Sequence, residues 1–133
     1  MKRNVVLIAV VIALVAGAAV AAAPSARLAG RVEAAQSAFA KVAHAKGHHV
    51  DLFFIDSGVM WANRDRDLGI RTTTGDCPND YLPYLVENEV AVGICTPCAK
   101  NRRLDEALFF SNMQLDGGPH LIDMAAEAKV FNF

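Results

Sequence analysis

The sequence predicts an α/β fold: a mainly parallel sheet with helices on both faces. The chain has 133 residues, which is the size of one domain and enough to bury a core without disulfides or metal ions. Short apolar runs rich in β-branched residues alternate with helical patterns, as they do in parallel sheets. Because crossovers between parallel strands are right-handed, helices should cover both faces and give a small three-layer α/β/α domain.

Residues 1–23 form an apolar N-terminal segment that fits two interpretations. Lys2 and Arg3 precede an uncharged apolar run at residues 5–23 that ends in small residues, which is typical of a signal peptide. The run is also long enough to anchor the chain in a membrane. Asn4–Val11, however, has the composition of a buried parallel strand. The segment is therefore a first strand or a signal or anchor, and residues 24–133 form the α/β domain.

The first helix and the next strand follow. A helix is predicted from Pro24, with Ser25 as its N-cap, to Gly47, whose missing side chain favours a helix end. Its apolar residues recur at helical spacing and should face the core; they are Leu28, Val32, Ala35, Phe39 and Val42. Val50–Ile55 is the next strand, and the loop 56–59 should lie beside the loop that follows any parallel neighbour strand.

Three histidines near the end of this helix raise the question of a metal site. They are His44, His48 and His49. No carboxylate or cysteine is clearly placed to complete a site with them, and a histidine near a helix C-terminus interacts favourably with the helix dipole. We therefore expect no metal ion, and no other cofactor, in this protein.

The middle of the chain is less regular. Val59–Asn63 should be a short helix whose Trp61 packs into the core. Arg64–Asn79 is polar and reads as a long loop. Cys77, within that loop, is expected to be an inert packing thiol. A second short helix is predicted at Tyr81–Val86, with Asp80 as its cap.

Two cysteines follow the next strand directly. Val90–Ile94 is short, apolar and β-branched, and should be a buried strand. Cys95 and Cys98 come at its carboxyl end, where chemistry collects in open α/β sheets, and a helix can begin at Ala99. Helix N-terminal N–H groups and nearby cations favour a thiolate. We therefore expect Cys95 to be the reactive thiol that the fold exposes at this edge.

The cations near this motif are Lys100, Arg102 and Arg103, and we expect them to bind the substrate. The formal net charge of −1 gives no sign of direct nucleic-acid binding, which needs a clear excess or patch of positive charge. The count of three cysteines is odd, so a closed disulfide framework is not expected.

The last part of the chain should add two strands and a helix. Leu108–Leu115 can form a strand that ends in a turn at residues 116–118. Pro119 then opens a helix that runs to Ala128, and Lys129–Phe133 closes the chain as a final strand.

Several of these segments together resemble the DsrE/TusD (DsrE/F-like) sulfur-relay family, from about Ala26 to Phe133. The matching stretches are Leu-Phe-Phe-Ile-Asp-Ser-Gly-Val-Met-Trp-Ala-Asn from Leu52, Val-Gly-Ile-Cys before Thr96, the pair Arg102 and Arg103, Ser-Asn-Met-Gln-Leu from Ser111, and the closing Ala-Glu-Ala-Lys-Val-Phe-Asn-Phe. The resemblance implies a sheet of about five strands, homo- or hetero-oligomers, and a strand-end cysteine that carries sulfur as a persulfide. Cys95 stands at that position, whereas Cys98 departs from the simplest carriers, which need one cysteine.

The family also has a first strand at the centre of its sheet, and Asn4–Val11 is the candidate for it. Loss of this strand would expose the edges of its neighbours, which is an aggregation hazard. We therefore expect the segment to be retained and the protein to be cytoplasmic, with a periplasmic or membrane-anchored protein as the alternative.

The resemblance implies a sulfur carrier or sulfurtransferase that takes sulfane sulfur on Cys95 and exchanges it with donor and acceptor proteins. The alternative is a thiol–disulfide oxidoreductase that uses Cys95 and Cys98, because C-x-x-C is a redox motif. Ile94 stands where thioredoxin-like proteins have an aromatic residue. A binding module whose thiols merely pack is a third possibility, and a zinc site is a distant fourth since one C-x-x-C supplies only two ligands.

Overall fold

The structure is a computed structural model that describes residues 4–9, 23–66 and 69–132. Five strands form one sheet in the order β4-β3-β2-β1-β5, and every neighbouring pair is parallel. The strands are β1 (Asn4–Ala9), β2 (His49–Phe54), β3 (Val92–Cys95), β4 (Met113–Asp116) and β5 (Lys129–Asn132). The helices are α1 (Ala23–Ala45), α2 (Leu82–Glu87), α3 (Thr96–Asn101) and α4 (Gly118–Glu127), with 3₁₀ helices η1 (Asp56–Ala62), η2 (Pro78–Asp80) and η3 (Glu106–Leu108).

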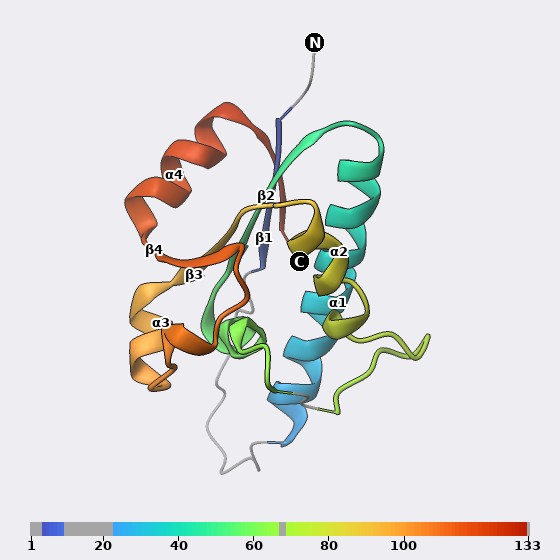
Figure 1. Cartoon of the computed structure of the whole chain (residues 1–133), viewed down its shortest axis with the longest axis vertical. Coiled ribbons are helices and arrows are strands. Elements are labelled where there is room, and N and C mark those ends of the chain that lie inside the picture. The colour runs from blue at the N-terminus through green and yellow to red at the C-terminus, as the bar shows by residue number, and fades with distance from the viewer. Residues whose placement is uncertain (1–3, 10–22, 67–68, 133) are drawn as a thin grey trace.

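The strand order explains the layers. From β1 to β4 the chain steps across the sheet in one direction, and it then returns to the far side of β1 to form β5. Since parallel crossovers are right-handed, the return helix α4 lies on the face opposite α1 and α2, as Figure 1 shows. The predicted three-layer α/β/α fold with a parallel sheet of about five strands is confirmed.

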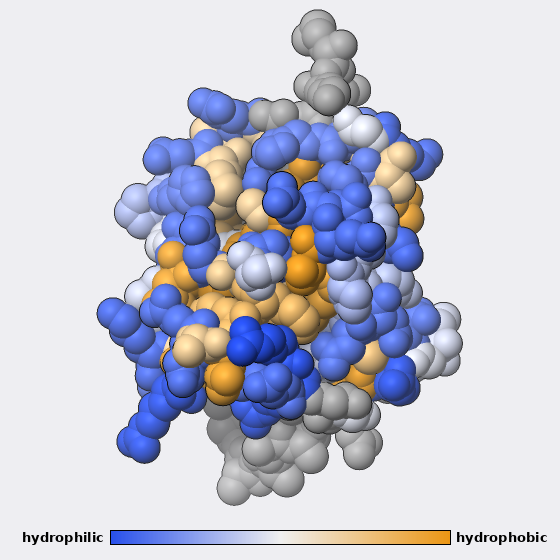
Figure 2. Space-filling model, in the orientation of Figure 1, coloured by the Kyte–Doolittle hydropathy of each residue, from blue (hydrophilic) through white to orange (hydrophobic). Residues whose placement is uncertain are grey.

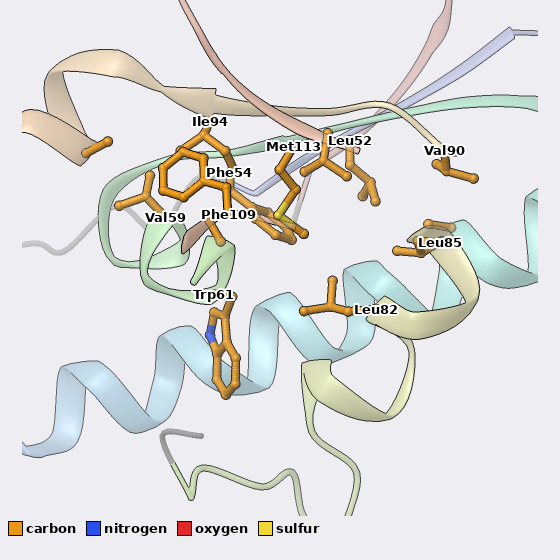
Figure 3. Packing of buried hydrophobic residues seen from close by; sticks show 14 of the residues in the cluster. Leu52, Phe54, Val59, Trp61, Leu82, Leu85, Val90, Ile94, Phe109 and Met113 are labelled. Carbon is orange, nitrogen blue, oxygen red and sulfur yellow. The ribbon is translucent and has the colours of Figure 1, made fainter. Parts of the chain in front are cut away.

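The main core lies between the sheet and the layer that contains α1, α2 and η1. Side chains from the two layers point toward each other in this space (Figure 3). Trp61 from η1 is 1% exposed, so its predicted packing role is confirmed. Larger core residues that are almost fully buried come from strands, from η1 and from α2: Leu52, Phe54, Val59, Trp61, Leu82, Leu85, Val92 and Ile94.

The predicted buried stripe of α1 is wrong for its C-terminal half. Phe39 is 58% exposed and Val42 is 52% exposed, whereas Ala34, Ser37 and Ala40 are buried. These three residues are spaced by three positions and share one helix face. Their small side chains let the helix axis approach its neighbours closely, and hydropathy alone does not reveal this use of small residues.

β1 occupies an interior position in the sheet. Val5 pairs with Val50 of β2 on one side and with Lys129 of β5 on the other. Residues 4–9 therefore form the first strand that was one of the two interpretations of the N-terminal segment. Residues 1–3 and 10–22 lie outside the described residues. Among the helices of the described part, none is both long and apolar enough to cross a membrane. The division of the chain into an N-terminal segment, residues 1–23, and an α/β domain, residues 24–133, stays a prediction.

The C-terminal elements differ from the predicted ones mainly at their boundaries. α3 begins at Thr96 rather than Ala99, because Pro97 fits the first turn of a helix. β4 begins at Met113 rather than Leu108. Leu108 ends the 3₁₀ helix η3, in which the Asp105 carboxylate accepts a hydrogen bond from the Ala107 N–H at 3.0 Å, and the Met113 N–H closes a turn by donating to the Phe110 carbonyl.

Candidate functional site

Two free thiols meet at the carboxyl edge of the sheet. Cys95 is the last residue of β3 and the N-cap of α3, and Cys98 lies in the first turn of that helix. The Cys95 thiol donates a hydrogen bond to the Cys98 Sγ, with the two sulfur atoms 2.9 Å apart. Both residues are half-buried and pack against the edge of the main core. The chain therefore presents a close dithiol pair.

Asp56, the first residue of η1, holds this pair from the neighbouring strand. Its backbone N–H donates a hydrogen bond to the Cys98 Sγ at 3.3 Å. Its carboxylate accepts a 2.6 Å bond from the Arg102 guanidinium. Asp56 has a φ of +49°, a left-handed conformation that Asp tolerates better than most residues. The expectation that the loops after β2 and β3 lie together is confirmed.

Sequence reasoning did not assign Asp56 to the site. The available signal was its position directly after a parallel strand, at the same sheet edge as Cys95. Its left-handed backbone, which turns the N–H toward Cys98, has no sequence signature, because Asp is common at loop starts in many conformations.

The protonation of Cys95 differs from the sequence expectation. Burial raises the pKa of the Cys95 thiol above its ordinary value, and the hydrogen bond to Cys98 raises it further. The Cys98 backbone N–H and the Arg102 guanidinium act in the opposite direction but do not outweigh these effects. The predicted N–H group and cation do favour the thiolate, but burial and the bond to Cys98 outweigh them, so the expected net lowering of the Cys95 pKa is wrong.

The three predicted substrate-binding cations occupy different environments. Arg102 caps α3, is half-buried and is bound to Asp56. Lys100 and Arg103 are exposed, and within the described residues no hydrogen bond or ion pair joins either side chain to a thiol. Only Arg102 is thus brought into the electrostatic field of Cys95.

The end of β4 supports the other side of the motif. The Thr96 hydroxyl, one residue after Cys95, donates to the Asp116 carbonyl oxygen at 2.8 Å. The Asp116 carboxylate accepts a bond from the Gly117 N–H at 2.7 Å and contacts His120 Nδ1 at 2.6 Å. Asp116 therefore joins the start of α3 to the start of α4.

The thiols lie outside the pocket that the sheet forms with α4. A pocket of about 650 Å³ lies between the sheet and α4, and its walls include the His49–Asp51 and Asp116–His120 pairs but neither Cys95 nor Cys98. On the face that Figure 2 shows, apolar surface gathers in the middle, with more polar surface around it. The geometry of the dithiol suits chemistry at the surface rather than in an enclosed cavity.

The remaining candidates lie away from the dithiol. Cys77 is 3% exposed, and its pKa is raised by burial and by Asp80. His44 Nδ1 lies 3.1 Å from the Tyr84 hydroxyl. Across the described residues, no three His, Cys, Asp or Glu side chains gather as a metal-binding group.

Comparison with known proteins places the chain in context. The sequence profile of the DsrE/DsrF-like family matches residues 18–133. The crystal structure of the YchN protein from E. coli is similar in fold, with a TM-score of 0.68 and 16% sequence identity, and the alignment covers 100% of both chains. None of the curated proteins matches this chain in sequence.

Proposed function

The chain belongs to the DsrE/DsrF-like family, and we propose that it is a sulfur carrier that accepts sulfane sulfur on Cys95 as a persulfide and passes it to a partner protein. Family membership implies a sulfur-relay-related role. The observation that carries the proposal is the position of Cys95, a partly exposed thiol at the carboxyl end of an interior parallel strand. This is the edge at which open α/β sheets place their chemistry.

The loading step is a nucleophilic displacement at sulfur. The Cys95 sulfur attacks the sulfane sulfur of a donor, a new S–S bond forms, and the donor leaves as a thiolate. The thiolate is the attacking form, and burial raises the pKa of Cys95. Loading should therefore become faster as the pH rises.

The donor and the acceptor are expected to be proteins. Family members typically work with partner proteins, and the half-buried thiols lie at a surface edge that a partner can reach. The exposed Lys100 and Arg103 flank this edge and would meet an acidic partner surface, while Arg102 holds Asp56. We also propose that the protein forms homo- or hetero-oligomers.

Reversal of charge in Lys100→Glu and Arg103→Glu should slow sulfur transfer from a protein donor but not from a small polysulfide.

Persulfidation can be tested by the mass of the intact protein. After a brief incubation with polysulfide, the chain should gain about 32 Da, the mass of one sulfur atom. Cys95→Ser should abolish this gain. Cys77→Ser is the matched control, since Cys77 is buried away from the dithiol, and it should load like the wild type. A Cys95→Ser chain that loads normally would contradict the proposal.

A second candidate function is thiol–disulfide exchange by Cys95 and Cys98. The 2.9 Å separation of the two sulfurs favours it. An oxidoreductase should reduce insulin disulfides catalytically and show a reduction potential in the range of thioredoxin-like proteins. Catalytic insulin reduction without sulfur loading would favour this function over the carrier.

The cytoplasmic location remains part of the proposal. Cleavage after Ala23 during export would remove β1, which pairs with both β2 and β5. The intact mass of the native protein tests this point as well, because it reports whether residues 1–23 are present.

A further inference from the structure

The second thiol of the pair has an unused chemical capacity. A carrier needs only the sulfur that holds the cargo, yet Cys98 Sγ lies 2.9 Å from Cys95 Sγ. Cys98 is fixed in the first turn of α3, and Cys95 is the N-cap of the same helix. Any sulfur atom bound to Cys95 is therefore attached beside a second thiol.

Hydrogen bonds make the two sulfurs unequal. Cys98 Sγ accepts from the Asp56 N–H at 3.3 Å and from the Cys95 thiol at 2.9 Å. Once Cys95 carries the extra sulfur, its Sγ has no hydrogen to donate, and the Asp56 N–H remains as a donor to Cys98 Sγ. A hydrogen bond to a thiolate stabilises it, so the loaded chain keeps a donor directed at the sulfur that would attack.

The Asp56 donor is held in place from α3 itself. Its carboxylate binds Arg102 at 2.6 Å, and Arg102 is the C-cap residue of the helix that carries Cys98. The ion pair therefore links the loop after β2 to the far end of α3. This arrangement keeps the Asp56 N–H directed at Cys98.

We propose that Cys98 is a resolving thiol that attacks the Sγ of persulfidated Cys95, forms the Cys95–Cys98 disulfide and expels the terminal sulfur as hydrosulfide. This inference rests on the proposed persulfide at Cys95. The new bond joins the two cysteine sulfurs, and the bond between Cys95 Sγ and the terminal sulfur breaks. The Cys98 thiol is oxidised to its half of the disulfide, and the sulfane sulfur is reduced to hydrosulfide with the electron pair of the broken bond.

The proposal changes the output of the protein. If an acceptor reaches the terminal sulfur first, sulfur passes on as a persulfide and both thiols are restored. If none arrives, the chain releases hydrosulfide and remains as a disulfide until a dithiol reductant restores it through disulfide exchange. Cys98 thus limits the lifetime of the loaded state.

The experiment uses the full chain, reduced, loaded briefly with polysulfide and freed of excess donor by desalting. In the wild type, the loaded species should lose about 34 Da, which is one sulfur and two hydrogens. One equivalent of hydrosulfide should appear, and peptide mapping should find Cys95 joined to Cys98. Cys98→Ser should keep its added sulfur and release hydrosulfide at least about tenfold more slowly. Cys77→Ser should behave like the wild type.

The outcomes separate the two proposals. If neither the wild type nor Cys98→Ser gains sulfur, the carrier function fails. If Cys98→Ser loads and the wild type also stays loaded, or moves the sulfur to Cys98 without releasing it, only the resolving role fails. Cys98→Ala provides a second variant should serine disturb the fold, and the disulfide mapped in the wild type is a readout that needs no variant.

Discussion

Gly93 lies on β3 two residues before Cys95, where the sheet beneath the dithiol leaves no room for a side chain. A Cβ at this position would lie 2.6 Å from the Phe53 Cδ2 atom and 3.1 Å from an Asp116 carboxylate oxygen. Phe53 is 2% exposed, so its ring has little room to move away. The absence of a side chain at Gly93 therefore lets β2, β3 and β4 fill this face together.

Gly93→Ala should lower the free energy of unfolding by about 1–3 kcal/mol, the usual cost of overpacking. Urea denaturation measures the change. Gly118→Ala is the matched control, because no atom lies within 4 Å of its added Cβ, and its stability should stay within about 0.5 kcal/mol of the wild type. Equal stability of the Gly93→Ala and wild-type chains would contradict the packing described here.

The raised pKa of Cys95 predicts its reactivity toward alkylating agents. Because burial and the bond to Cys98 raise the pKa, Cys95 is mainly protonated at neutral pH. Its alkylation by iodoacetamide should accelerate about tenfold per pH unit below its pKa. Mass spectrometry of the fragmented peptide distinguishes Cys95 from Cys98. A Cys95 rate that is already constant between pH 7 and pH 8 would show that the thiol is ionised there.

At the scale of elements, α3 begins at the end of β3 and α4 begins just after β4. Asp116, the last residue of β4, contacts both helix starts. Asp116 accepts from Thr96 at the start of α3, and its carboxylate contacts His120 in the first turn of α4. The carboxylate raises the pKa of His120 above its ordinary value, first through the hydrogen bond and then through charge. The joint between β4 and α4 is therefore sensitive to pH.

Since the folded-state pKa of His120 is raised, the stability that this pair contributes is complete below the ordinary histidine pKa of about 6.5. It is lost as the pH rises through the raised value. NMR titration of His120 should give a pKa above the ordinary histidine value of about 6.5. Asp116→Asn should bring the His120 pKa down. An unchanged titration in Asp116→Asn would exclude the pairing.

The sequence predicts the elements better than it predicts their faces. Short apolar runs identified β2 and β3, because an interior strand buried on both faces is largely apolar, whereas the edge strand β5 keeps Val130 and Phe131 exposed. The dithiol at the end of β3 was predicted for the same reason. The buried face of α1 was not, because it uses Ala34, Ser37 and Ala40 while Phe39 faces outward. Asp56 was missed because its role depends on one backbone dihedral angle.

At the scale of the whole molecule, β1 holds the sheet together. It joins β2, which leads toward the dithiol, to β5 at the C-terminus. A chain that begins at Pro24 lacks β1, and its β2 and β5 lose their shared hydrogen-bonding partner. Unpaired strand edges of this kind promote aggregation.

The truncated chain that begins at Pro24 should show no cooperative thermal unfolding transition, because its sheet is divided. Circular dichroism measures the transition, and light scattering reports aggregation. A chain that lacks only residues 1–3 retains β1 and serves as the control. Cooperative unfolding of the chain that begins at Pro24 would mean that the protein folds without its first strand, and export with cleavage would then be compatible with the fold.

The pairing of Val5 with Lys129 also has a consequence for synthesis. Of the five described strands, β1 is synthesised first, and β5, one of its two neighbours, is synthesised last. The nascent chain can form the β1–β2 ladder early, but β1 keeps one open edge until the C-terminal residues emerge. Contacts between such distant parts of a chain form slowly, so the sheet should close only after β5 has been synthesised.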